Sequence, residues 1–91
     1  MSILQMTDKI TSLKTMEETM SIQFLLVNYS EDRTVLADGQ SVGVTNHTIM
    51  LPSDEYTVSL AGAKDYSPDS QDVALTGTSV MKPRVVLFSK L

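Results

Sequence analysis

The chain of 91 residues contains no cysteine, no tryptophan and only one histidine. Without cysteine, neither a disulfide framework nor a thiolate metal site can form. Any imidazole-based catalysis or metal binding would depend on His47 alone, beside Asn46 and Thr48 in a polar stretch that is typical of a turn. The sequence also lacks a Gly-x-Ser-x-Gly nucleophile motif and a His-Glu-x-x-His motif. We therefore expect no enzyme, no catalytic residue and no cofactor.

Positive charge is scarce, and long apolar runs are missing. The chain has 7 basic and 11 acidic residues, which gives a net charge of −4 without the basic patch that phosphate binding requires. No apolar run exceeds four residues, whereas a membrane-spanning helix needs about 20. We expect neither a nucleic-acid partner nor a membrane span. The N-terminus does not look like a signal peptide, so we expect an intracellular protein or a fragment without its export signal. The sequence leaves the compartment open.

The first 20 residues have the pattern of an amphipathic helix. Ser2 and Gln5 have the spacing of a capping box, and fewer than three heptads are present, too few to predict a coiled coil. Apolar residues recur at steps of three and four, which places them on one helical face, although Glu17 interrupts the series. These residues are Ile3, Met6, Ile10, Leu13 and Met20. We leave three alternatives open for this helix: it packs on its own domain, it frays, or it binds another copy or a partner protein.

From residue 21 to residue 91 the pattern changes to short β-rich runs separated by turn residues. Asp38 and Gly39 between two such runs are typical of a type I′ hairpin, and the first run is apolar on both faces, which indicates a central strand. About seven strands with closely spaced turns predict an all-β fold, an antiparallel β-sandwich preceded by the N-terminal helix. The runs are 21–29, 34–37, 41–44, 48–51, 56–61, 72–75, 79–81 and 84–88.

Several turn and strand motifs between residues 30 and 88 resemble those of a known family. They are Asp38-Gly39, Val42-Gly43 with Thr45, Glu55-Tyr56-Thr57-Val58 and Tyr66-Ser67-Pro68. The chain here resembles a PEGA domain, a small β-sandwich module of bacteria and archaea. It departs from that pattern where Ser30–Arg33 replaces the naming tetrad, Asn46 a proline, and Asp54 and Asp65 turn glycines. The resemblance implies a non-catalytic contact module of surface or envelope proteins, and it supplies no catalytic residues.

Two groups of residues are weak candidates for ligand binding. Asp65, Asp69 and Asp72 offer oxygen ligands of the kind that calcium prefers, although their spacing differs from that of an EF-hand loop and a solvated loop is the simpler interpretation. Tyr56 and Tyr66 are amphipathic and could form a surface for sugar or protein, or they could pack at corners of the sandwich.

These observations favour a non-catalytic structural or protein-interaction module, with self-association as one form of contact. In this hypothesis the helix and an exposed sheet edge bury apolar surface against another copy or a partner protein. The alternative is a ligand-binding module for carbohydrate or another component of the cell envelope, which would use the tyrosines and the acidic loop.

Overall fold

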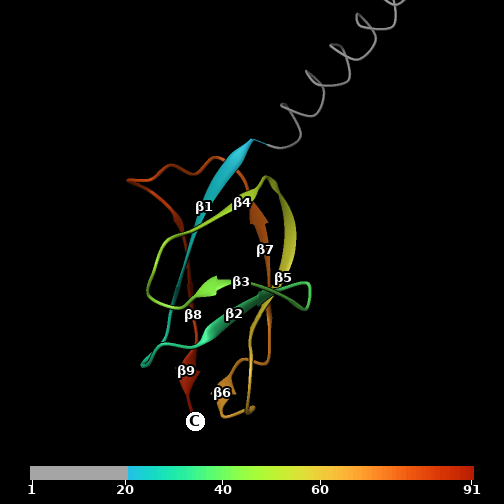
Figure 1. The fold of residues 1–91 in the computed structure, drawn as a ribbon, viewed down its shortest axis with the longest axis vertical. Coiled ribbons are helices and arrows are strands. Elements are labelled where there is room, and N and C mark those ends of the chain that lie inside the picture. Colours follow the sequence, from blue (N-terminus) through green and yellow to red (C-terminus); the bar gives the residue numbers. More distant parts are fainter. Residues whose placement is uncertain (1–20) are drawn as a thin grey trace, which may run out of the picture.

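The computed structural model describes residues 21–91, which form nine short strands and no helix (Figure 1). The prediction of an all-β fold is confirmed for these residues. The predicted helix over residues 1–20, with its apolar positions, lies outside the described residues. In the described part of the chain, no helix is long and apolar enough to cross a membrane.

A three-stranded sheet contains the beginning and the end of the described chain. Its central strand, β1 (Ile22–Asn28), pairs antiparallel with β4 (Ile49–Pro52) and parallel with β8 (Arg84–Leu87). The central position of β1, with a neighbour on each side, agrees with the prediction from its two apolar faces.

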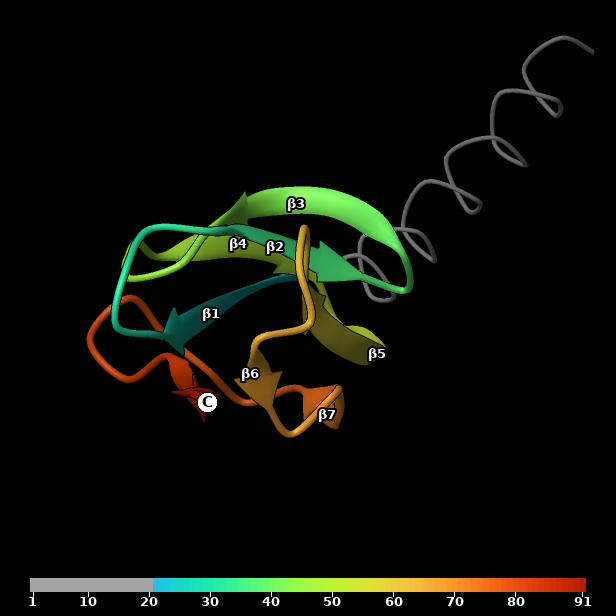
Figure 2. The ribbon, with the colours of Figure 1, turned by 90° about the horizontal axis from the view of Figure 1, so that it is seen from below.

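A four-stranded sheet is built from the middle of the chain, in the order β3-β2-β5-β7, and all its pairs are antiparallel. β2 and β3 lie side by side in both views (Figures 1 and 2). A third, two-stranded sheet joins β6 to β9. The strand bounds are β2 Thr34–Ala37, β3 Gln40–Val44, β5 Asp54–Leu60, β6 Tyr66–Ser67, β7 Gln71–Leu75 and β9 Ser89–Lys90.

One hydrophobic core lies between the three-stranded and the four-stranded sheet. Alternate residues of each strand point into it, as the period of two in a β-strand requires. This arrangement is consistent with a β-sandwich. The buried residues are Leu25, Val27, Ile49 and Val86 from the first sheet, Val35, Val58, Leu60, Val73 and Leu75 from the second, and the aromatic residues Tyr29, Tyr66 and Phe88.

Two features of the β2–β3 hairpin determine how it packs. Asp38 and Gly39 have positive φ angles of 52° and 83°, as a type I′ turn requires and as the sequence predicted. Gly43 lies beside Ile49, and a Cβ atom at this glycine would be only 2.6 Å from Cγ1 of Ile49. The missing side chain therefore allows β3 to approach β4 closely.

Three details differ from the sequence-based prediction. The described residues form nine strands, because β6 and β9 are two-residue strands too short to show any alternation. The sheets are not purely antiparallel, since β1 and β8 run parallel. The prediction of a strand at 79–81 was wrong. The backbone groups of Ser79 and Lys82 form two hydrogen bonds with each other, of 3.2 and 3.0 Å, and these close a turn.

Candidate functional site

The three predicted calcium ligands do not form a common site. Oδ1 of Asp65 accepts a hydrogen bond of 2.7 Å from Nη2 of Arg33, while Oδ1 of Asp72 accepts one of 3.0 Å from the Thr57 hydroxyl. Asp69 is exposed in the turn between β6 and β7. Across residues 21–91, no three His, Cys, Asp or Glu side chains are grouped so that they could hold a metal ion. The structure thus does not bring the predicted ligands together.

Arg33 connects the segment between β1 and β2 to the segment after β5. Its Nη1 donates hydrogen bonds of 3.0 and 3.1 Å to the carbonyl oxygens of Ala61 and Ala63. Its ion pair with Asp65 lowers the pKa of that carboxyl and raises the pKa of the guanidinium, mainly through the hydrogen bond between them. The side chain of Arg33 is only 14% exposed, so it acts as a structural link rather than as a free cation for a ligand.

A second ion pair lies beside this link. Nζ of Lys90 is 3.1 Å from Oε1 of Glu31, and this hydrogen bond lowers the pKa of Glu31 and raises that of Lys90. The pair joins the β1–β2 connection to the C-terminal strand β9. Together with Arg33 and Asp65, this pair links the connections at this end of the domain to β9.

Tyr66 is a core residue and not part of a ligand surface. Its side chain is 1% exposed, and its hydroxyl donates a hydrogen bond of 2.9 Å to the Leu60 carbonyl and accepts one of 3.2 Å from the Leu60 amide. Its ring meets Tyr29 and Phe88 edge-on, with ring centroids 6.3 and 5.4 Å apart. The expectation of a ligand-contacting ring therefore does not hold for Tyr66, because the ring fills the end of the core.

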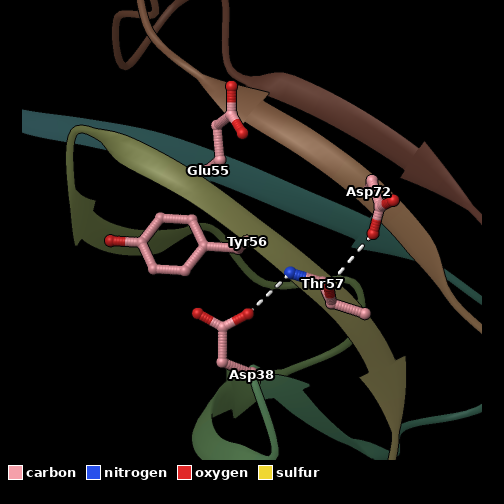
Figure 3. A pocket seen from close by; sticks show the side chains of 5 residues that line it. All are labelled: Asp38, Glu55, Tyr56, Thr57 and Asp72. Carbon is pink, nitrogen blue, oxygen red and sulfur yellow. Dashed lines mark hydrogen bonds between the residues drawn. The ribbon is translucent and has the colours of Figure 1, made fainter.

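Tyr56, by contrast, lines an open hollow of about 280 Å³ on the four-stranded sheet (Figure 3). The side chain is half-buried, and its hydroxyl donates a hydrogen bond of 2.6 Å to the Pro52 carbonyl. Partial burial, together with the nearby carboxylates of Asp54 and Asp38, raises the pKa of Tyr56.

Three carboxylates give this hollow its acidic character, and Figure 3 shows two of them pointing toward Thr57 from opposite sides. Asp38 accepts a hydrogen bond of 2.8 Å from the Thr57 amide, and Asp72 binds the Thr57 hydroxyl. Glu55 is exposed at the rim. Such a hollow can accept hydrogen bonds from hydroxyl or amino groups, whereas the ring of Tyr56 packs against the core, on the side of β5 that also carries Val58.

The single histidine lies in the turn between β3 and β4. The side chain of His47 is 66% exposed, and its Nε2 is 3.8 Å from Oδ2 of Asp32, which is equally exposed. This position agrees with the interpretation of His47 as a turn residue at the surface.

The most unusual surface is the side of the three-stranded sheet that faces away from the core. Strand register places Phe24 beside Met50 and Leu26 beside Val85. We call this surface the outer face, and none of its side chains is charged. It consists of Ile22, Phe24, Leu26, Asn28, Met50, Pro52, Val85 and Leu87.

Four large apolar side chains of the outer face are well exposed. The exposed fractions are 66% for Met50, 62% for Leu87, 52% for Ile22 and 46% for Val85. The sequence indicated that β1 is apolar on both faces, from which we predicted a central strand. It gave no indication that one of these faces has no cover within residues 21–91. The pairing of β8 with β1, which completes the patch, was also missed.

Comparisons with models of known protein families, with curated proteins and with solved structures find no match for this chain. The PEGA-like assignment therefore stays a prediction that rests on the turn and strand motifs alone. The predicted interaction residues Ile3, Met6, Ile10, Leu13 and Met20 lie outside the described residues.

Proposed function

We propose that this chain is a non-catalytic structural module that makes protein–protein contacts through the outer face of its three-stranded sheet. One observation carries the proposal, namely a sheet face of large apolar side chains, of which Met50 and Leu87 are more than half exposed. When one face of a sheet covers the core, the other is normally polar where it meets water. Contiguous exposed apolar surface of this kind marks sites of interaction with other molecules.

The charged residues support the same proposal by their positions. Arg33, Asp65, Glu31 and Lys90 bind one another at one end of the domain, where they stabilise connections between strands. The outer face has no such groups, so its contacts with a partner are apolar. A contact module is also what the PEGA resemblance implies.

Affinity capture with matched variants tests the proposal. The bait is the tagged full chain, expressed together with an untagged copy, so that both self-association and other partners are scored. Met50→Lys/Leu87→Lys adds two charges to the outer face. Val80→Lys/Met81→Lys adds the same charges at exposed residues, 65% and 87% accessible, in the β7–β8 connection. We expect the wild-type bait and the Val80→Lys/Met81→Lys control to capture a protein that the Met50→Lys/Leu87→Lys bait does not capture. Equal capture by all three baits would contradict the proposal.

A second candidate function is carbohydrate binding at the acidic hollow. The carboxylates of the hollow suit a sugar, since they accept hydrogen bonds from its hydroxyl groups. Titration of neutral oligosaccharides, followed by NMR shifts of Thr57, tests this candidate. Asp72→Asn should weaken binding, whereas Asp69→Asn, at an exposed turn residue outside the hollow, should not. Unchanged spectra at every sugar concentration would remove the candidate.

A further inference from the structure

We infer that the partner of the outer face is a second copy of this chain, so that the face forms the interface of a homo-oligomer. This inference rests on the proposed function and names its partner. Three observations support it: the composition of the outer face, the way in which the chain enters β1, and the area that a stable interface needs.

The composition of the outer face suits contact between identical surfaces. Interfaces of homodimers are more apolar than those of transient complexes, and charge complementarity is the usual means of selecting a different partner. The outer face carries only apolar side chains and Asn28. In a two-fold pairing the same face of each copy contacts the other copy. A face without charged side chains makes this contact without repulsion between like charges.

The sequence just before β1 contains no turn residue that would fold the N-terminal segment back onto this face. The carbonyl of Ser21 already accepts a hydrogen bond of 2.8 Å from the Ser53 amide, so residue 21 is held beside the β4–β5 connection before β1 begins at Ile22. A connection that reverses direction between a helix and a strand takes about 2–6 residues and favours Gly, Pro, Asn or Asp. Residues 17–20 contain none of these, and the predicted apolar series continues to Met20.

The area of the outer face points to a partner that also offers an amphipathic segment. β1 is about 23 Å long, while β4 and β8, with four residues each, are about 13 Å long, so the three strands cover on the order of 240 Å². A stable interface buries about 800 Å² on each partner. The predicted apolar series of residues 3–20 ends two positions before Ile22. A second copy therefore offers two apolar surfaces, the outer face and the predicted helix face, which follow each other along the chain in the same order. An unrelated partner would have to match two separate surfaces.

The solution mass of the full chain, measured by size-exclusion chromatography with light scattering, tests the inference. We expect wild type and Val80→Lys/Met81→Lys at an integer multiple, two or more, of 10.0 kDa, and Met50→Lys/Leu87→Lys at 10.0 kDa. Circular dichroism and a cooperative thermal transition establish that the face variant is folded. Should it fail to fold, Met50→Gln/Leu87→Gln replaces it, because neutral polar side chains at these exposed positions are milder changes.

Two results would overturn the inference. A wild-type mass of 10.0 kDa would show that the free chain is monomeric. A folded face variant that keeps the wild-type multiple would place the contact between copies elsewhere on the chain. In either case the capture experiment decides separately about the proposed function: a different protein captured through the outer face would leave that function standing without self-association.

Discussion

Thr45 joins two parts of the chain through one fully buried hydroxyl group. Its Oγ1 accepts a hydrogen bond of 2.8 Å from the Arg33 amide and donates one of 2.8 Å to the Glu31 carbonyl. Thr45→Val keeps the shape of the side chain but leaves both backbone groups without this partner. We expect the free energy of unfolding, measured by urea denaturation, to fall by about 1–3 kcal/mol.

The matched control for this substitution is Thr48→Val, because Thr48 is exposed in the same β3–β4 connection. We expect it to change the free energy of unfolding by no more than about 0.5 kcal/mol. Equal effects of the two substitutions would contradict a structural role for the buried hydroxyl.

Gly43 is a packing residue rather than a turn residue. An added Cβ would lie 2.6 Å from Cγ1 of Ile49, which is 4% exposed and has little room to move. Gly43→Ala should therefore lower the free energy of unfolding by about 1–3 kcal/mol through overpacking. Ser41→Ala, at an exposed position of the same strand, is the control. A Gly43→Ala protein as stable as wild type would show that β3 and β4 separate at low cost.

The ion pair of Arg33 and Asp65 makes stability depend on pH. The hydrogen bond from Arg33 holds the pKa of Asp65 below its usual value, so the carboxylate contributes stability above its unfolded pKa. That contribution is lost as the pH falls through the folded pKa. We expect the melting temperature to decrease on acidification below the usual carboxyl range. Asp65→Asn should reduce this decrease, and Asp69→Asn should not. The same pH profile for both variants would contradict the role of the pair.

At the scale of elements, the sequence predicted those features that depend on local chemistry. The strand runs 34–37 and 84–88 correspond closely to β2 and β8, and the Asp38-Gly39 turn forms as expected. These succeed because alternation and turn residues act over a few positions. The parallel pairing of β1 with β8 depends on contacts between the two ends of the described chain, so no local pattern specifies it.

The candidate site could be predicted only in part for the same reason. The apolar character of both faces of β1 is visible in the sequence, but exposure of one face depends on which strands flank β1 and what covers them. For Tyr66 the sequence left a ligand surface and packing in the sandwich open, because its burial depends on the distant Phe88 and Tyr29. Likewise, Asp65 interacts with Arg33 and Asp72 with Thr57, and both partners are remote in sequence.

The predicted helix of residues 1–20 has an expected role in the interface. If its apolar positions extend the contact between copies, Ile10→Lys/Leu13→Lys should shift the solution mass toward that of one chain, because charged side chains in an apolar seam are costly to bury. Thr11→Lys/Ser12→Lys adds the same charges at positions off the predicted apolar face and should leave the mass unchanged. An unchanged mass for both variants would restrict the interface to the described sheet.

At the scale of the whole molecule, the fold uses its two larger sheets in different ways. The four-stranded sheet combines one buried face with a polar surface that includes the acidic hollow. The three-stranded sheet has a buried face and an apolar outer face, so in a single copy it leaves apolar surface in water. Association between copies removes that surface from water, and the hydrophobic effect then stabilises the assembly.

Solvent access at residue 50 tests most directly whether the outer face is covered in solution. Because the chain has no cysteine, Met50→Cys and Met81→Cys each carry a single thiol, at positions that are 66% and 87% exposed in one copy. We expect iodoacetamide to modify Met50→Cys about tenfold more slowly than Met81→Cys, which corresponds to about 1.4 kcal/mol of protection. The difference should disappear on dilution as the copies separate. Equal rates of modification at every protein concentration would contradict a covered outer face.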